Sequence, residues 1–320
     1  MESLPSLLKM TPYFHPVVWG GRKLASAYSK PLPEGVAIGE SFEVSAVPEM
    51  ESIVASGPLK GSNVQDLTQT YGPLFLGKDV YQRYEGEFPL LIKLLDANDD
   101  LSIQVHPDDK YARANSLGNF GKMEAWYVLR SDGGKIASGL KEGVDEQALV
   151  AAVESGTVED LVKFYPVSEG NIVYLKPGSV HTLCSGVMVY EVQQSSSITF
   201  RLYDYNRPEP DGSLRELHIE QSLDVINFGD PAIIPAPVDA PTAVLSEHFI
   251  LEQYATDASS HHDAKDSFSC LTIVSGGGEI RADGEAINLN LADTVVIPTN
   301  RAFELAPSDE CKYLISSVPT

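Results

Sequence analysis

Four side chains in the first two-thirds of this 320-residue chain have the types and spacing of a metal site. Gln104 and His106 lie two residues apart in the alternating stretch LSIQVH, so a strand would place both on one face. Glu124 starts another apolar stretch, and His181 follows a strand, a proline and a short turn. Two imidazoles, a carboxylate and an amide oxygen suit a divalent ion of zinc type and leave room for water or a substrate.

A purely structural explanation of the same residues competes with this one. Pro107 cannot extend a strand ladder, so the strand ends near His106 and its polar residues could simply face water. His181 could be a turn histidine bonded to the backbone, and Glu124 an exposed strand carboxylate. Because the four candidates fall on three strand ends, the pattern favours the metal site.

Strand patterns dominate the sequence that must position these residues. Short stretches rich in β-branched and aromatic residues, bounded by Gly, Pro, Asn or Asp, predict strands at 88–97, 101–106, 124–130, 171–178, 187–193 and 197–204. Helical patterns are fewer, and they cover 144–156, 157–165 and 217–229. Many short strands with few helices favour a β-sandwich or barrel core that carries helical excursions.

A domain boundary is expected where prolines cluster and periodicity vanishes. The stretch DPAIIPAPVDAPTAV at 230–244 has the composition of an extended linker. We therefore expect a metal-binding domain over 1–232, a linker at about 233–244, and an all-β domain over 245–320. The second domain is expected to cover part of the apolar face of the first.

The all-β part echoes the first part and predicts a duplicated barrel unit. The similar stretches are 124–136 with 269–280, and 171–183 with 293–305. Counting four residues on from the proline aligns His181 with Ala302, and Glu124 aligns with Ser269 or Cys270. Since Ala302 cannot bind a metal where His181 can, we expect one ion per chain, in the first unit only. The histidine pair at 261–262 lies in a polar stretch and is expected at the surface.

Charge and cysteine usage limit the partners and the compartment. The chain has 23 basic and 45 acidic residues, which argues against nucleic acid or an anionic membrane as a partner. An anionic substrate is compatible with this charge, because a few local Lys and Arg can dominate inside a cleft. The three cysteines, Cys184, Cys270 and Cys311, form no CxxC motif, so a reducing cytoplasm is the default. No leader or membrane-spanning stretch is recognisable.

Several motifs together resemble the type I mannose-6-phosphate isomerases of the short bacterial form. They are FHPVVWGG (14–21), GESFEVSA (39–46), LLIKLLDANDDLSIQVHPDD (90–109), GKMEAWYVL (121–129), LKPGSVHTL (175–183) and FRLYDYNRP (200–208). The resemblance implies a mainly β fold of two cupin-type (jelly-roll) β-barrels. It also implies a zinc cofactor, with another divalent ion as an alternative. The implied activity is the interconversion of mannose 6-phosphate and fructose 6-phosphate.

The resemblance also implies residue roles. The metal ligands would be Gln104, His106, Glu124 and His181. Arg201, Glu191 and Lys122 would be catalytic, while Lys93, Lys122 and Arg201 would bind the hexose 6-phosphate. Two features depart from the family pattern. The large helical insertion of longer members is absent, and Met123 stands where they have a proline.

The implied reaction sets requirements that these residues can be tested against. Moving a carbonyl from C1 to C2 through an enediolate needs a base near the carbons, a cation near the oxygens, and a grip on the phosphate. A lysine serves well as a point charge for phosphate, although Lys93 could instead be a strand lysine that reaches solvent. An arginine near Glu191 would lower its pKa and make it a ready base. A structural salt bridge between Glu191 and Arg201 is the alternative.

Two other functions compete with the isomerase. A cupin dioxygenase would use three histidines and a carboxylate, so Gln104 counts against oxygen chemistry. A non-catalytic, metal-containing sugar-phosphate binder would keep the same residues, and only an activity assay separates it from an enzyme. The oligomeric state and the preferred hexose phosphate are left open by the sequence.

Overall fold

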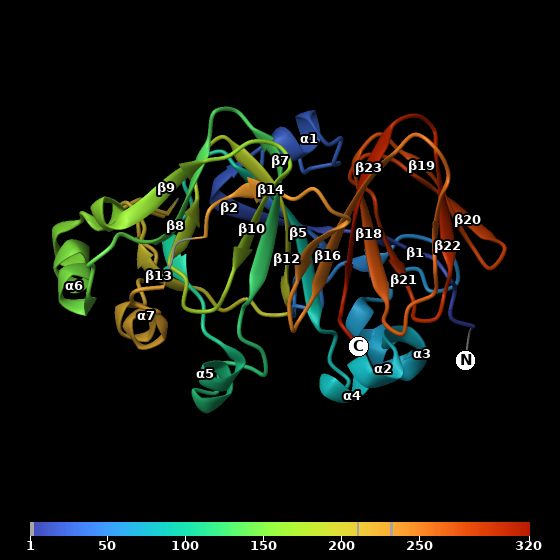
Figure 1. The fold of residues 1–320 in the computed structure, drawn as a ribbon, viewed down its shortest axis with the longest axis horizontal. Coiled ribbons are helices and arrows are strands. Elements are labelled where there is room, and N and C mark those ends of the chain that lie inside the picture. Colours follow the sequence, from blue (N-terminus) through green and yellow to red (C-terminus); the bar gives the residue numbers. More distant parts are fainter. Residues whose placement is uncertain (1–2, 210, 231–232) are drawn as a thin grey trace.

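The computed structural model describes residues 3–209, 211–230 and 233–320, and its architecture is mainly β, as the sequence predicts. Four sheets form two units that lie side by side (Figure 1). Each unit pairs one larger sheet with one smaller sheet. Within the described residues, no helix is both long and apolar enough to cross a membrane.

The first unit holds the candidate site residues. Its larger sheet has the order β14-β10-β7-β12-β5-β2-β3. These strands are β2 (Tyr13–Gly21), β3 (Ile38–Val44), β5 (Leu90–Ala97), β7 (Glu124–Ser131), β10 (Asn171–Leu175), β12 (Val187–Gln194) and β14 (Ala236–Pro237). Its smaller sheet has the order β13-β6-β11-β8-β9. These are β6 (Ile103–Val105), β8 (Lys135–Leu140), β9 (Val162–Pro166), β11 (His181–Leu183) and β13 (Phe200–Tyr203).

The second unit combines both ends of the chain. Its larger sheet has the order β15-β16-β23-β18-β21-β1-β4. These strands are β1 (Leu8–Thr11), β4 (Ile53–Val54), β15 (Thr242–Leu245), β16 (Ile250–Thr256), β18 (Ser269–Ser275), β21 (Thr294–Ile297) and β23 (Cys311–Ser317). Its smaller sheet has the order β17-β22-β19-β20. These are β17 (Ser260–His262), β19 (Gly278–Ala282), β20 (Glu285–Leu289) and β22 (Phe303–Pro307).

The strand orders confirm the predicted duplication. The order β10-β7-β12-β5 recurs as β21-β18-β23-β16, and β6-β11-β8-β9 recurs as β17-β22-β19-β20. The register corrects one residue of the predicted alignment. His181 begins β11 and lies opposite Gln104 on β6. Phe303 begins β22, the strand that corresponds to β11, and lies opposite His262 on β17. Phe303 and not Ala302 is therefore the counterpart of His181. The proline count was wrong by one because Pro177 follows its strand after one residue, whereas Pro298 follows directly.

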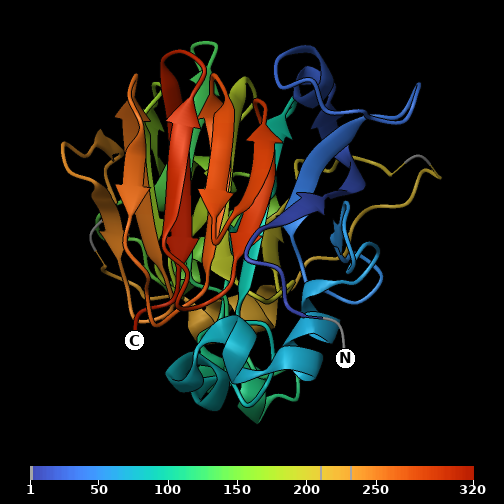
Figure 2. The same ribbon diagram turned by 90° about the vertical axis from the view of Figure 1, so that its right-hand side faces the viewer.

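The two larger sheets pack face to face, which confirms that the second unit covers an apolar face of the first. Figure 2 shows the orange and red C-terminal strands in front of the green strands of the first unit. The shared core joins Ile92 and Val192 to Phe249 and Leu314. Every residue of β5 and β12 is buried, because one face lines the first unit and the other meets the second. This explains why these strands read as nearly continuous apolar stretches.

Short helices decorate the sheets. They are α1 (Lys23–Ser26), α2 (Val64–Tyr71), α3 (Pro73–Leu76), α4 (Lys78–Arg83), α5 (Asp109–Ala114), α6 (Glu146–Ser155) and α7 (Ile219–Val225). The helix predicted over 144–156 is confirmed by α6: the Asp145 side chain accepts the Ala148 N–H, and Gly156 ends the helix in a left-handed conformation. The helix predicted over 217–229 is confirmed by α7.

The helix predicted over 157–165 is wrong. A single 3₁₀ turn occupies Val158–Leu161, and the chain then continues as β9, which pairs with β8. The free edge of β8 supplies backbone partners that a local pattern cannot reveal. Tertiary pairing therefore outweighs the local helical preference.

Candidate metal and substrate site

Three of the four predicted metal ligands converge between the two sheets of the first unit. Glu124 begins β7, His181 begins β11, and His106 directly follows β6. Glu124 Oε1 lies 3.1 Å from His181 Nε2, and Glu124 Oε2 lies 3.6 Å from His106 Nε2. One ligand atom from each residue lies within 4.8 Å of the others, and all three residues are buried. This group has the composition and spacing to hold a metal ion.

The protonation of these groups suits cation binding. His181 Nδ1 donates to the Ser179 carbonyl oxygen at 2.9 Å, so Nε2 is the ring nitrogen that faces Glu124 and could ligate a cation. Burial and the nearby Lys122 ammonium lower the pKa of His106 well below its ordinary value, which keeps that imidazole neutral. Burial raises the pKa of Glu124, but Lys122 and the two imidazoles outweigh burial and hold it well below the ordinary range.

Gln104 and Lys122 complete the surroundings of this group. Gln104 lies opposite His181 in the ladder, with its Nε2 3.4 Å from His181 Nε2 and its Oε1 accepting from Ser102 at 3.2 Å. Turning the amide by 180° would present its oxygen instead, and the Ser102 hydroxyl can donate or accept in either case. The Lys122 ammonium lies 3.0 Å from Glu124 Oε2 and 3.2 Å from His106 Nε2. A positive group thus already contacts two of the donor atoms, so the donor set fits a cation.

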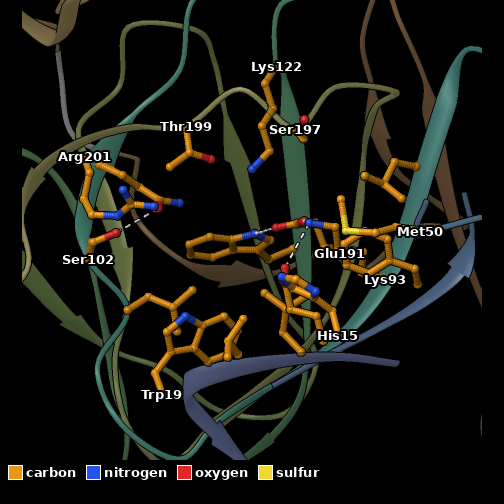
Figure 3. Close-up of a pocket in the computed structure, with 18 of the residues that line it drawn as sticks. His15, Trp19, Met50, Lys93, Ser102, Lys122, Glu191, Ser197, Thr199 and Arg201 are labelled. Atoms are coloured by element: carbon orange, nitrogen blue, oxygen red, sulfur yellow. Dashed lines mark hydrogen bonds and ion pairs between the residues drawn. The ribbon is translucent and has the colours of Figure 1, made fainter. Parts of the chain in front are cut away.

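A cavity of about 300 Å³ opens beside these residues. Lys93, Lys122, Glu191 and Arg201, which the sequence marks as catalytic or substrate-binding, all line it. Figure 3 shows their side chains pointing into this common space. The volume is at the lower end of the range for small-molecule pockets. The structure therefore brings every predicted site residue to one place.

Glu191 differs from the expectation in its partners and its pKa. It lies opposite Trp126 and Lys93 in the sheet, and Trp126 Nε1 donates to its Oε2 at 2.7 Å. Burial and the charge of Glu124 raise its pKa. The expected lowering by an arginine is wrong. No ion pair joins Glu191 to Arg201 in the described part of the chain, so the alternative of a structural salt bridge between them is also wrong.

Further cavity residues were missed by the sequence analysis. Glu40 on β3 pairs with Lys93, and Ser102, Trp126 and Arg215 also line the space. Glu40 lies within the quoted motif GESFEVSA, but that strand carries polar residues on both faces, so its periodicity does not show which face is inward. Lys93 is buried beside Glu40 and does not reach solvent.

The corresponding place in the second unit is filled by aromatic rings. His262, the counterpart of Gln104, is buried and not at the surface as expected. It lies 2.9 Å from the Tyr313 hydroxyl, and its ring stacks on Phe303 at 4.7 Å between centroids. The expectation for His262 was wrong because residues 260–262 form the short strand β17, in which side chains alternate between faces. His261 is exposed, and His262 points into the unit.

Two duplicated β units, one of them holding a buried His–Glu–His group beside a polar cavity, define a two-unit, mainly β protein with a candidate metal site. A sequence profile described as phosphomannose isomerase type I, catalytic domain, matches residues 7–128. The probable mannose-6-phosphate isomerase GmuF of Bacillus subtilis is 32% identical over 318 residues, covering 97% of this chain and 98% of that protein. The chain belongs to the type I phosphomannose isomerase family.

Two further comparisons agree. The mannose-6-phosphate isomerase of Streptococcus mutans is 33% identical over 290 residues, covering 89% of this chain and 90% of that protein. The crystal structure of the mannose 6-phosphate isomerase from Bacillus subtilis superimposes with a TM-score of 0.86 at 29% identity. That alignment covers 98% of this chain and 99% of the other. The similarity thus extends over both units.

Proposed function

We propose that this chain interconverts mannose 6-phosphate and fructose 6-phosphate. The observation that carries the proposal is a single cavity lined by Glu191 and Lys122, whose ammonium lies 3.0 Å from Glu124 Oε2 and so places the His106–Glu124–His181 group directly behind the cavity wall. An aldose-ketose isomerase needs this combination of a cation site for the oxygens and a base for the carbon-bound proton. Family membership supports the same conclusion.

We further propose zinc as the resident ion, held by Gln104, His106, Glu124 and His181. Imidazole and carboxylate ligands suit zinc, although other divalent ions accept the same set. When bound, the ion would polarise the carbonyl of the substrate as a Lewis acid.

The proton transfer is assigned to Glu191. Its carboxylate takes the proton from C2 of the aldose and returns it to C1, while a hydroxyl proton moves from O2 to O1. The enediolate between these steps carries negative charge on its oxygens, and the Arg201 guanidinium at the cavity wall stabilises that charge. The raised pKa of Glu191 makes it a stronger base than an exposed carboxylate, which favours abstraction from carbon.

The cationic wall of the cavity is proposed to bind the phosphate. Lys122 and Arg215 line it, together with the hydroxyls of Ser102 and Thr199. A phosphate with two negative charges can accept several charge-assisted hydrogen bonds from such groups. An acidic surface elsewhere does not prevent this, because exposed charges are screened by salt.

The domain assignment and the compartment are parts of the same proposal. Residues 1–232 would supply the catalytic domain and 245–320 the metal-free domain, joined at about 233–244. Two short strands of the N-terminal part, β1 and β4, pair with the second sheet, and β14 from the joining segment pairs with the first. All three cysteines are free and buried, in keeping with a reducing cytoplasm.

A coupled assay of mannose 6-phosphate conversion tests the function. Turnover that is lost with a chelator and restored by added zinc is the expected result. Binding of the sugar phosphate without turnover, in protein that contains stoichiometric metal, would establish the non-catalytic binder instead.

The metal stoichiometry gives a separate prediction. We expect one tightly held divalent ion per chain, because the second unit has Phe303 and His262 where the first has His181 and Gln104. Elemental analysis of metal-replete protein measures this number. His181→Ala should reduce it to near zero, and two ions per chain would contradict the assignment.

Lys122→Ala tests phosphate recognition. The variant is expected to raise KM for mannose 6-phosphate roughly 10-fold or more, as the loss of a charged hydrogen bond of about 1.5–3 kcal/mol implies. Steady-state kinetics with and without the phosphate group measure the effect. If the wild type turned over free mannose as well as its phosphate, this part of the proposal would be refuted.

A further inference from the structure

The Lys93 ammonium lies between two carboxylates at the cavity, the half-buried Glu40 and the buried Glu191. Its Nζ is 3.0 Å from Glu40 Oε1 and 3.5 Å from Glu191 Oε1. Only 9% of the Lys93 side chain is exposed, against 14% for Glu40 and 3% for Glu191. Such a group of charges is costly to bury and is held together by its mutual contacts.

The sheet fixes these three side chains on one inner face. Phe42, Lys93 and Glu191 lie opposite one another on β3, β5 and β12. Glu40 precedes Phe42 by two residues, so its side chain projects from the same face of β3. The Lys93 ammonium also lies 4.6 Å from the centre of the Phe42 ring, a distance typical of a cation–π contact. The position of the ammonium is therefore set by three strands.

One ammonium cannot neutralise two carboxylates, and Lys93 stabilises the negative charge of Glu40 more than that of Glu191. Burial raises the pKa of Glu40, but the charge and hydrogen bond of Lys93 outweigh burial and lower it below the ordinary value. The pKa of Glu191 is raised by burial and by Glu124, and the more distant Lys93 does not offset this. Two carboxylates in one cavity are thus pushed in opposite directions, a pattern typical of acid–base sites.

We propose that Glu40 is a positioning residue that holds Lys93 away from Glu191 and so keeps the Glu191 carboxylate free to accept the substrate proton. This inference rests on the proposed function, in which Glu191 transfers the proton. It gives Lys93 a role as an internal counter-ion in place of a direct phosphate contact. We assign this role because the Lys93 ammonium already donates a hydrogen bond to Glu40 at 3.0 Å before any substrate binds.

Other charged and polar groups also face Glu40 and Glu191, and they remain unchanged in the test. Trp126 on β7 donates to Glu191, and His15 on β2 lies 3.9 Å from Glu40. Glu124 and Lys122 act on Glu191 with opposite signs through space. None of these groups is altered in the variants below, so changes in Glu191 report on Glu40 and Lys93.

Glu40→Gln is the first variant. Without the Glu40 charge, Lys93 moves onto Glu191, lowers its pKa and weakens it as a base. We expect kcat to fall roughly 10–100-fold, part of the 10²–10⁴ that a positioned base supplies, with KM within a few-fold of wild type. The acid limb of the kcat profile should move to lower pH. Glu40→Asp keeps the charge beside Lys93 and should retain more activity than Glu40→Gln.

The double variant Glu40→Gln/Lys93→Met makes the test decisive. Removing the misplaced ammonium should restore part of the lost kcat, so the double variant is more active than Glu40→Gln alone. Losses that add would overturn the proposal, because they mean that Glu40 and Lys93 act independently. A Glu40→Gln variant that raises KM at unchanged kcat would also overturn it, because it means that Glu40 contacts the substrate directly. Thermal unfolding and metal content of each variant confirm that it is folded and loaded.

A titration of Glu191 separates this inference from the proposed function. Carboxyl signals of ¹³C-glutamate-labelled protein, with Glu191 assigned by Glu191→Gln, should show a lower pKa in Glu40→Gln than in wild type. If this pKa shift is seen but the wild-type protein has no isomerase activity, the counter-ion arrangement is supported and the proposed function is refuted. An unchanged Glu191 pKa in an active enzyme would refute the counter-ion arrangement alone.

Discussion

Arg201→Ala is expected to lower kcat by roughly 10²–10³-fold with little change in KM, the scale seen when one preorganised donor is removed from a developing charge. Arg201 lies on β13 opposite Gln104, and both residues line the cavity, so the guanidinium lies next to this proposed metal ligand. One of its nitrogens donates to the Glu216 carbonyl at 2.9 Å, which fixes the group before substrate binds. A permanently charged guanidinium cannot compete for the migrating proton. Its contribution therefore grows as the enediolate forms.

Arg215→Ala is the matched control for Arg201→Ala. Arg215 also lines the cavity, but Asp204 accepts a hydrogen bond from its Nε at 2.7 Å and neutralises it. We expect this variant to raise KM more than it lowers kcat. Near-normal turnover of Arg201→Ala, in protein with full metal content and an unchanged melting temperature, would contradict the role of Arg201.

Glu191→Gln is expected to reduce kcat by roughly 10³-fold, within the range for loss of a general base. The amide keeps the shape of the carboxylate, and its oxygen can still accept from Trp126 Nε1. Because the pKa of Glu191 is raised in the folded protein, the wild-type kcat should increase with pH as this group loses its proton. The rise should be absent from the residual activity of Glu191→Gln. A pH–rate series on both proteins measures this difference.

Heavy water shows whether Glu191 carries the proton between carbons. A carboxylic acid exchanges its proton with solvent, so wild-type product should contain deuterium at C1 or C2. Product that retains all of its original hydrogen would exclude proton transfer by Glu191. A metal-assisted hydride shift would then explain the reaction, with Glu191 handling only the hydroxyl proton.

Local patterns predicted much of the strand content, because the alternation of side chains along a strand is a property of neighbouring residues. The strands carrying Gln104, Glu124, Glu191 and Arg201 were all expected near their observed positions. The short helices α2 to α4 were not predicted, since four to eight residues provide too little periodicity to recognise. The helix predicted at 157–165 became β9 because the edge of β8 was available for pairing.

The sequence by itself determined the residue types of the site and the duplication. It also showed that the second unit has Ala302, and no histidine, close to the position that corresponds to His181. These follow from spacing within short segments. Tertiary structure decided which charges meet. The pairing of Lys93 with Glu40, and the separation of Glu191 from Arg201, depend on the register of strands far apart in the chain. Electrostatic interactions fall off over a few ångströms, so only the folded register decides whether Glu191 becomes a weak or a strong base.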